Sequence, residues 1–128
     1  PIWQGVIAAW LEKLKRGEKI EIWGDGAVVR DYLYIDDVVS AISLAMTSPI
    51  SKRTFNVGSG VGCSLKYLHE VLESSLQREI PVVYTPGRTV DVPVSVLDIT
   101  EICVALGWRP KISLEDGLRR TWAEFGHV

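Results

Sequence analysis

IWGDGAVVRDYLYIDDVV, residues 22–39, joins a strand end, a glycine turn, an arginine, a second apolar run and two aspartates. Gly24 and Gly26 permit backbone angles with positive φ that a side chain resists. Asp25 between them suits a tight turn, because its carboxylate can bond the local backbone. Arg30 follows, and its planar guanidinium can hold a carboxylate or a phosphate through two hydrogen bonds. Taken alone, the pattern also fits a plain hairpin with a surface arginine, because such turn signals are common.

Apolar spacing on either side of this stretch predicts an α/β chain. Helical spacing predicts helices over residues 2–15, from Asp36 or Asp37 to Ser48, and over 64–76, 98–106 and 113–125. Short apolar or alternating runs predict strands over residues 19–23, 32–35, 54–57 and 80–84. Asp36 or Asp37 and then Ser64 are the expected N-caps of their helices. A strand, a crossover helix and a strand favour parallel pairing.

Length and composition restrict the class of protein. The 128 residues are the size of one domain, residues 1–128, and 47% of them are hydrophobic, as in ordinary globular proteins. A formal net charge of −2 leaves no broad cationic field for nucleic acid. No apolar run approaches the ~20 residues that span a bilayer, so no membrane association is expected. The N-terminus reads Pro1-Ile2-Trp3, without Met, and resembles a chain that begins inside a longer one.

The two cysteines bear on the cellular compartment, because disulfides persist mainly in oxidising compartments. Cys63 and Cys103 lie far apart and in no metal-ligand spacing. One disulfide between them is compatible with the sequence, but reduced thiols in a cytoplasmic protein are the favoured interpretation.

Two loops carry residue types that suit a ligand. The glycine loop at residues 58–62 follows a strand and precedes a helix, but its G-x-G-x-G spacing is not the dinucleotide fingerprint G-x-G-x-x-G. A close approach to another ligand, or a tight turn, fits it better. In the proline-bracketed loop after residue 84, Arg88 could clamp a phosphate and Asp91 could accept bonds from sugar hydroxyls, or the two could form a loop salt bridge. Trp23 is the aromatic residue best placed to flank a planar ligand.

Together these blocks resemble the C-terminal part of the NAD-dependent epimerase/dehydratase family, the extended short-chain dehydrogenases that act on nucleotide sugars. The blocks are residues 22–26, 30–39, 55–60, 88 with 91–93, 106–110 and 114–118. Their order and spacing are most similar to UDP-sugar 4-epimerases, with dTDP-glucose dehydratases next. The resemblance implies a small mixed substrate domain plus edge strands and a helix of the Rossmann sheet, with the N-terminal NAD domain absent.

The same resemblance implies a nucleotide-sugar pocket. Arg30 and Arg88 match the two arginines that hold the diphosphate, and Asp91 matches the carboxylate that meets the ribose. Ile22 and Trp23 match the strand end beside the uracil, and Val61 matches a glycine-loop residue that lines the pocket. The implied substrate-binding residues are Ile22, Trp23, Arg30, Val61, Arg88 and Asp91.

Catalytic residues of the family are not found in this sequence. The family needs a glycine-rich NAD loop and a Tyr-x-x-x-Lys pair, in which the lysine lowers the pKa of the tyrosine. The fourth residue after Tyr32, Tyr34, Tyr67 and Tyr84 is never lysine. We therefore expect no catalytic or cofactor-binding residue here: NAD belongs to the full-length family, and the chain alone should be inactive.

The expected function is that of an epimerase fragment that contributes the UDP-sugar pocket. The alternatives are a non-catalytic nucleotide-sugar-binding or oligomerisation module that stands alone, and a fragment similar to dTDP-sugar 4,6-dehydratases. Residues 32–45 and 54–57 would normally add to the edge of the NAD sheet. Without that sheet they leave a strand edge and an apolar face uncovered, which predicts a homo-oligomer.

Overall fold

The computed structural model describes residues 5–51, 54–87 and 92–125. In chain order its elements are α1 (Val6–Lys15), β1 (Ile20–Trp23), β2 (Val29–Asp31), α2 (Ile35–Thr47), β3 (Gly62–Ser64), α3 (Leu65–Leu76), β4 (Val82–Thr85), β5 (Val94–Ser95), α4 (Thr100–Leu106) and α5 (Leu114–Phe125). The mixture of helices with parallel and antiparallel strands confirms the α/β class expected from the sequence. Among the helices within these ranges, none combines the length and the apolar character that crossing a membrane requires.

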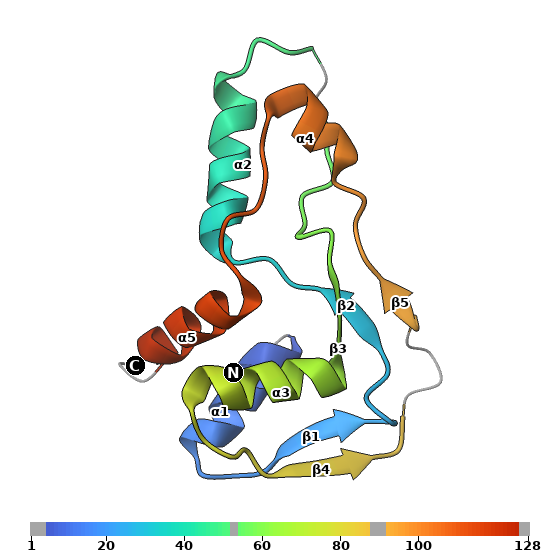
Figure 1. The fold of residues 1–128 in the computed structure, drawn as a ribbon, viewed down its shortest axis with the longest axis vertical. Coiled ribbons are helices and arrows are strands. Elements are labelled where there is room, and N and C mark those ends of the chain that lie inside the picture. The colour runs from blue at the N-terminus through green and yellow to red at the C-terminus, as the bar shows by residue number, and fades with distance from the viewer. Residues whose placement is uncertain (1–4, 52–53, 88–91, 126–128) are drawn as a thin grey trace.

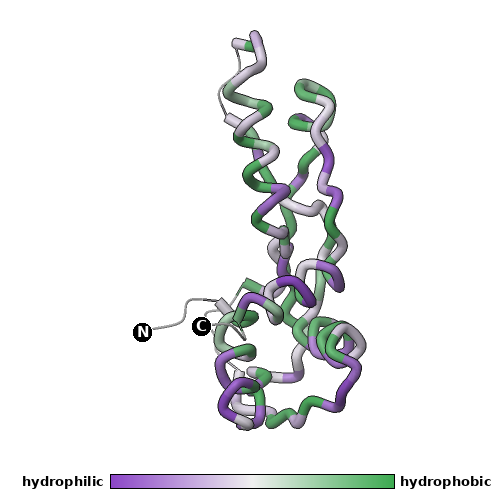
Figure 2. Tube along the Cα trace, turned by 90° about the vertical axis from the view of Figure 1, so that its left-hand side faces the viewer, coloured by the Kyte–Doolittle hydropathy of each residue, from purple (hydrophilic) through white to green (hydrophobic). Residues whose placement is uncertain are grey.

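The elements form a body and a long arm (Figure 1). The body holds α1, α3 and α5 with the sheet of β1 and β4. The arm holds α2, α4 and the extended segment 54–60, and the sheet of β2, β3 and β5 joins the two parts. Figure 2 shows the arm again as a narrow projection in the perpendicular view.

The body contains the larger core. β1 pairs parallel with β4, with Ile20 opposite Val82. The parallel unit predicted across the helix at residues 64–76 does not form, because residues 54–57 are not a strand and β4 pairs with β1 instead. Ile20 is fully buried, and the indole N–H of Trp10 donates to the backbone oxygen of Glu21 at 2.8 Å. Buried side chains of this core are Trp10, Leu11, Leu14, Ile20, Ile22, Cys63, Leu68, Val71, Leu72, Ile80 and Leu118.

A three-stranded sheet lies between body and arm, and β2 is its central strand. β2 runs antiparallel to β3, with Arg30 opposite Cys63, and parallel to β5, with Arg30 opposite Ser95. Arg30 therefore lies at the middle of the central strand, flanked by backbone on both sides.

The arm has a much smaller core. Ala41, Ile102 and Trp108 form its buried cluster. Asp37 is also buried, and its carboxylate accepts the backbone N–H of Lys111 at 3.1 Å and of Ile112 at 3.0 Å. These bonds tie α2 to the segment that leads into α5.

The opposite side of α2 faces solvent. Ile35, Val39, Ile42 and Met46 are 60%, 53%, 53% and 81% exposed, and their spacing places them on one side of the helix. We call these four side chains the outer stripe. It is the uncovered apolar face that the sequence predicted.

Two of the strand predictions are wrong. Residues 32–35 are not a strand, because β3 and β5 pair only with Val29–Asp31 and helical turns begin at Ile35. Residues 54–57 form no strand either, because no other strand in the described ranges lies beside them. Three short strands, β2, β3 and β5, form in segments where the sequence had predicted no strand.

The helix caps are partly as expected. The Ser64 hydroxyl accepts the backbone N–H of Tyr67 at 3.1 Å, which confirms that cap. The N-cap of α2 is Tyr34, with no side-chain bond, so capping by Asp36 or Asp37 is wrong. The buried carboxylate of Asp37 has backbone N–H partners of its own in the 108–113 segment, across the arm.

Candidate functional site

Arg30 is anchored where three strands and one loop meet. Its Nη1 donates to the backbone oxygen of Val92 at 2.7 Å and to that of Val29 at 2.8 Å. Val92 is the first described residue after the 88–91 segment. Both acceptors are neutral, and within the described ranges no carboxylate forms an ion pair with Arg30. Among the described residues the guanidinium is therefore held by carbonyl groups alone.

Asp31, the next residue, binds a different set of groups. Its Oδ1 accepts the backbone N–H of Ser59 at 2.8 Å and also the Ser59 hydroxyl. Its Oδ2 accepts the N–H of Gly60 at 3.0 Å and of Leu97 at 3.3 Å. Partial burial favours a higher pKa for Asp31, but these donors outweigh it and hold the pKa below its usual value. Asp31 is therefore ionised over the physiological range.

These bonds bear on the glycine loop at residues 58–62. The N–H groups of Ser59 and Gly60 are already donated to Asp31, and Gly62 belongs to β3. Backbone N–H groups that cradle a dinucleotide phosphate must point at the ligand. The loop therefore does not fit the pyrophosphate of NAD, and its tight turn has a structural cause.

The first glycine turn brings the ends of β1 and β4 together. Gly24 and Gly26 have φ of +69° and +77°, and the Asp25 carboxylate accepts the N–H of Ala27 at 2.9 Å, as the sequence predicted. A Cβ on Gly87 would lie 3.2 Å from the Cα of Gly24. A side chain on Gly87 would push the two backbones apart by a few tenths of an ångström, so glycine favours this approach, which places the end of β1 beside Gly87.

The expected substrate-binding residues fall into three groups. Arg30 and Trp23 lie half-buried, with Trp23 at the end of β1 opposite Thr85, while Val61 is 67% exposed. The side chain of Ile22 is fully buried in the core of the body, so in this structure only its backbone could meet a ligand. Arg88 and Asp91 lie outside the described residues, so convergence of the two arginines stays a prediction.

A cavity of about 410 Å³ opens between the central sheet, α3 and residues 110–115. Val61 borders it, but Ile22, Trp23 and Arg30 do not. The Tyr32 hydroxyl is buried without a partner in the described ranges, and burial raises the pKa of Tyr32 to about 12. Sequence reasoning had not selected Tyr32, although its position two residues after Arg30 was a usable signal.

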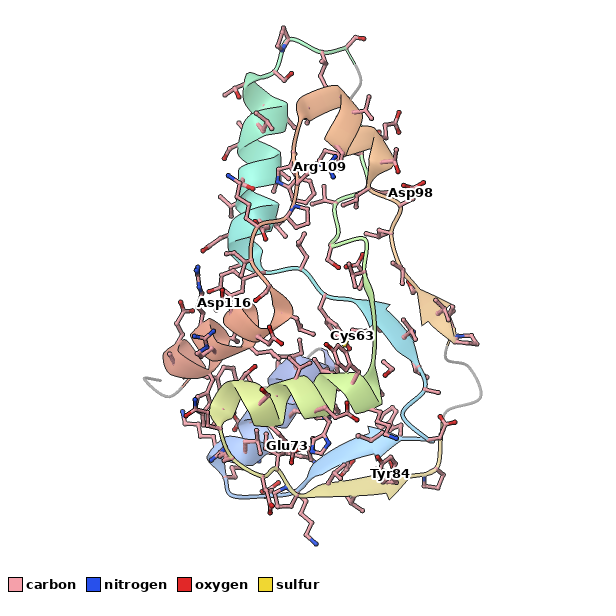
Figure 3. The ribbon with its side chains drawn as sticks, viewed as in Figure 1. Cys63, Glu73, Tyr84, Asp98, Arg109 and Asp116 are labelled. Atoms are coloured by element: carbon pink, nitrogen blue, oxygen red, sulfur yellow. The ribbon has the colours of Figure 1, made fainter. Side chains whose placement is uncertain are left out.

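The cysteines and the acidic groups offer no further chemistry. Cys63, labelled in Figure 3, lies on β3 above α3, and burial raises the pKa of its thiol to about 11, which disfavours the reactive thiolate. Cys63 and Cys103 are both free thiols. In the part of the chain that the structure describes, no group of three or more His, Cys, Asp or Glu could hold a metal ion.

Comparison with known proteins connects this geometry to a family. Residues 3–58 match the model of the NAD dependent epimerase/dehydratase family. A UDP-glucose 4-epimerase of Mycolicibacterium smegmatis is 36% identical over 117 residues, which cover 91% of this chain and 37% of the relative. The chain thus spans little more than a third of the length of that curated relative.

Solved structures agree in fold. A UDP-glucose 4-epimerase of Thermotoga maritima, crystallised with UDP-glucose, is 44% identical with a TM-score of 0.85, over 94% of this chain and 39% of that one. A Thermus thermophilus UDP-glucose 4-epimerase in complex with NAD is 32% identical with a TM-score of 0.83, over 96% and 40%. The whole fold described above therefore recurs inside longer proteins of this kind. The chain belongs to the NAD-dependent epimerase/dehydratase family.

Proposed function

We propose that this chain supplies the nucleotide-sugar-binding part of an NAD-dependent sugar 4-epimerase, with a UDP-sugar as its ligand. The observation that carries the proposal is the environment of Arg30. Its guanidinium is fixed by the carbonyls of Val29 and Val92, and no carboxylate in the described ranges neutralises it. A guanidinium held in place by neutral carbonyls suits a diphosphate, which offers several oxygens to its planar fork.

Neighbouring residues fit the rest of such a ligand. Arg88 would supply a second fork, and Asp91 would accept bonds from the ribose. The end of β1 at Trp23 offers an aromatic surface to the base. The similarity to a UDP-glucose 4-epimerase crystallised with UDP-glucose supports this assignment.

Chemistry on the sugar needs groups that lie outside this sequence. No tyrosine here has a lysine four positions later, so the pair that accepts the sugar proton is missing. NAD, when bound to a family member, supplies the hydride acceptor for transient oxidation of the sugar. The chain alone should bind UDP-sugar weakly, because only part of the pocket is present, and should not turn it over.

The exposed face of α2 supports a second part of the proposal, self-association. The outer stripe presents four large apolar side chains to solvent on one helix face. Contiguous exposed apolar surface of this kind marks a contact with another protein surface. A two-fold pair of chains would bury both stripes against each other.

Calorimetric titration with UDP and UMP tests the binding proposal. Wild-type chain should bind UDP, and Arg30→Ala should weaken binding at least tenfold, whereas UMP, with one phosphate fewer, should bind weakly to both. Arg16→Ala is the matched control, because Arg16 is an exposed arginine that bonds Glu12 on α1. Equal UDP affinity for wild type and Arg30→Ala would refute the role of Arg30, and turnover of UDP-glucose by the pure chain would refute its inactivity.

A further inference from the structure

We infer that Asp31 is the positioning residue of this site: it fixes Arg30 and the backbone at Val92 for a diphosphate. This role rests on the proposed function. Asp31 itself does not reach the ligand. Adjacent residues of a strand point to opposite faces, so the side chains of Arg30 and Asp31 leave β2 on different sides.

The Asp31 carboxylate joins the two outer strands of the central sheet. Ser59 and Gly60, which donate to it, lie three and two residues before the start of β3. Leu97, which also donates to it, follows β5 by two residues. One ionised side chain on β2 therefore holds the chain that enters β3 and the chain that leaves β5.

The link from Asp31 to Arg30 passes through β5. This strand is only Val94–Ser95, so its own pairing with β2 is short. The carbonyl of Val92, two residues before β5, accepts the Nη1 of Arg30 at 2.7 Å. The backbone N–H of Val29 also holds the carbonyl of Pro93 at 2.8 Å, next to Val92. Asp31 would add a second tie at Leu97, on the other side of β5, to the segment whose Val92 carbonyl holds the guanidinium.

Local packing confines the carboxylate to this position. A Cβ on Gly58 would lie 2.6 Å from the Oδ2 of Asp31 and 3.0 Å from the side chain of Leu97. Gly58→Ala should therefore displace the carboxylate without removing it. Asp31→Asn keeps the shape but turns an N–H₂ group toward N–H donors, so at least one bond is lost.

The experiment compares these variants with a matched carboxylate elsewhere. Asp37 also accepts two backbone N–H groups, but its partners lie in the arm, so Asp37→Asn controls for general destabilisation. Two readouts are used: UDP affinity by calorimetry, and the hydrogen-exchange rate of the Arg30 guanidinium by NMR without ligand. Asp31→Asn should weaken UDP binding at least tenfold and speed Arg30 exchange at least tenfold. Asp37→Asn should lower the melting temperature but change neither readout more than twofold.

A double-mutant cycle tests whether Asp31 acts through Arg30. In an Arg30→Ala background, Asp31→Asn should weaken UDP binding no further, because the group that it positions is gone. Ser59→Ala removes only one hydroxyl donor to Asp31, so it should weaken UDP binding less than Asp31→Asn does. This variant replaces Asp31→Asn in the experiment if Asp31→Asn does not fold.

The outcomes separate the two proposals. If wild type binds no UDP, the proposed function fails, and Arg30 exchange alone decides whether Asp31 positions the guanidinium. If wild type binds UDP and Asp31→Asn binds equally well, the inference about Asp31 is overturned. It is also overturned if Asp37→Asn weakens UDP binding as much as Asp31→Asn, because the effect is then loss of stability.

Discussion

Replacing Ile42 with glutamate should convert a self-associating chain into a monomer. Ile42 lies at the centre of the outer stripe and is 53% exposed in the single chain. A buried glutamate in a two-fold interface would face its own copy or the partner's apolar side chains, and both placements are unfavourable. Ser43→Glu, one residue along the same helix and off the stripe, adds the same charge and is the matched control.

The exposed fractions set the expected affinity. Full burial of a side chain of this size stabilises by ~1.5–3 kcal/mol, so the exposed parts of Ile35, Val39, Ile42 and Met46 are worth roughly 5–6 kcal/mol per copy. Two copies give about 10–12 kcal/mol, against an association cost of ~4–15 kcal/mol. The net value lies between nothing and about 8 kcal/mol, which places dissociation constants at roughly 1 µM or weaker. Dimers should therefore appear between about one and hundreds of micromolar.

Sedimentation velocity over this concentration range is the assay. Wild type and Ser43→Glu should shift from monomer to dimer as concentration rises, while Ile42→Glu, which loses roughly 2–3 kcal/mol of apolar burial over two copies, should stay monomeric. A wild type that stays monomeric throughout would refute the argument. A dimer that Ile42→Glu leaves intact would place the contact on another surface.

Three further predictions concern stability and reactivity. Asp37→Ala should lower the free energy of unfolding by ~2–4 kcal/mol, measured by urea denaturation, because two buried N–H groups in the arm lose a charged acceptor. The pKa of Asp31 is lowered in the folded state, so its ionised carboxylate stabilises the fold. This contribution to the free energy of unfolding is complete above the unfolded pKa of 3.8 and is lost as pH falls through the folded pKa. Wild type should therefore lose more free energy of unfolding than Asp31→Asn below pH 4, measured by urea denaturation at each pH. Cys63, with its pKa raised to about 11, should react with iodoacetamide at pH 8 at least ~100-fold more slowly in the native chain than in urea, as mass spectrometry would show.

Sequence patterns predicted the body of this fold well, because its signals are local. α3 begins directly after Ser64, whose hydroxyl caps it. The strand near Ile20 follows from alternation of polar and apolar residues. Each of these features depends on a few adjacent residues, whereas the pairing of Ile20 with Val82 joins distant segments and was not predicted.

The arm was predicted less well, because its structure depends on distant partners. Thr54 and its neighbours have strand-like composition, but a strand needs a second backbone, and the described chain places none beside them. Asp37 sits where a helix cap is expected, yet its carboxylate bonds residues more than seventy positions later. No local pattern distinguishes these two uses of an aspartate.

The binding role of the candidate site residues stays a prediction, whereas the structure shows the surroundings of some of them. Arg30 was selected for its planar guanidinium, and its anchoring by Val92 depends on a contact 62 positions away. Ile22 was selected from the family pattern, but its side chain is buried in the core. Asp31 was not selected, because three of its four donors come from backbone N–H groups far along the chain.

The parallel pairing of β1 with β4 has a consequence during synthesis. Ile20 pairs with Val82, so 82 − 20 = 62 residues must be added before the second strand exists. At ~5–20 residues per second, translation takes roughly 3–12 s to cover that distance. Ile20 and Ile22, both fully buried in the finished fold, emerge from the ribosome long before their partner strand. During this interval the nascent chain therefore presents residues 20–23 as an apolar segment without the strand that covers its edge in the finished fold.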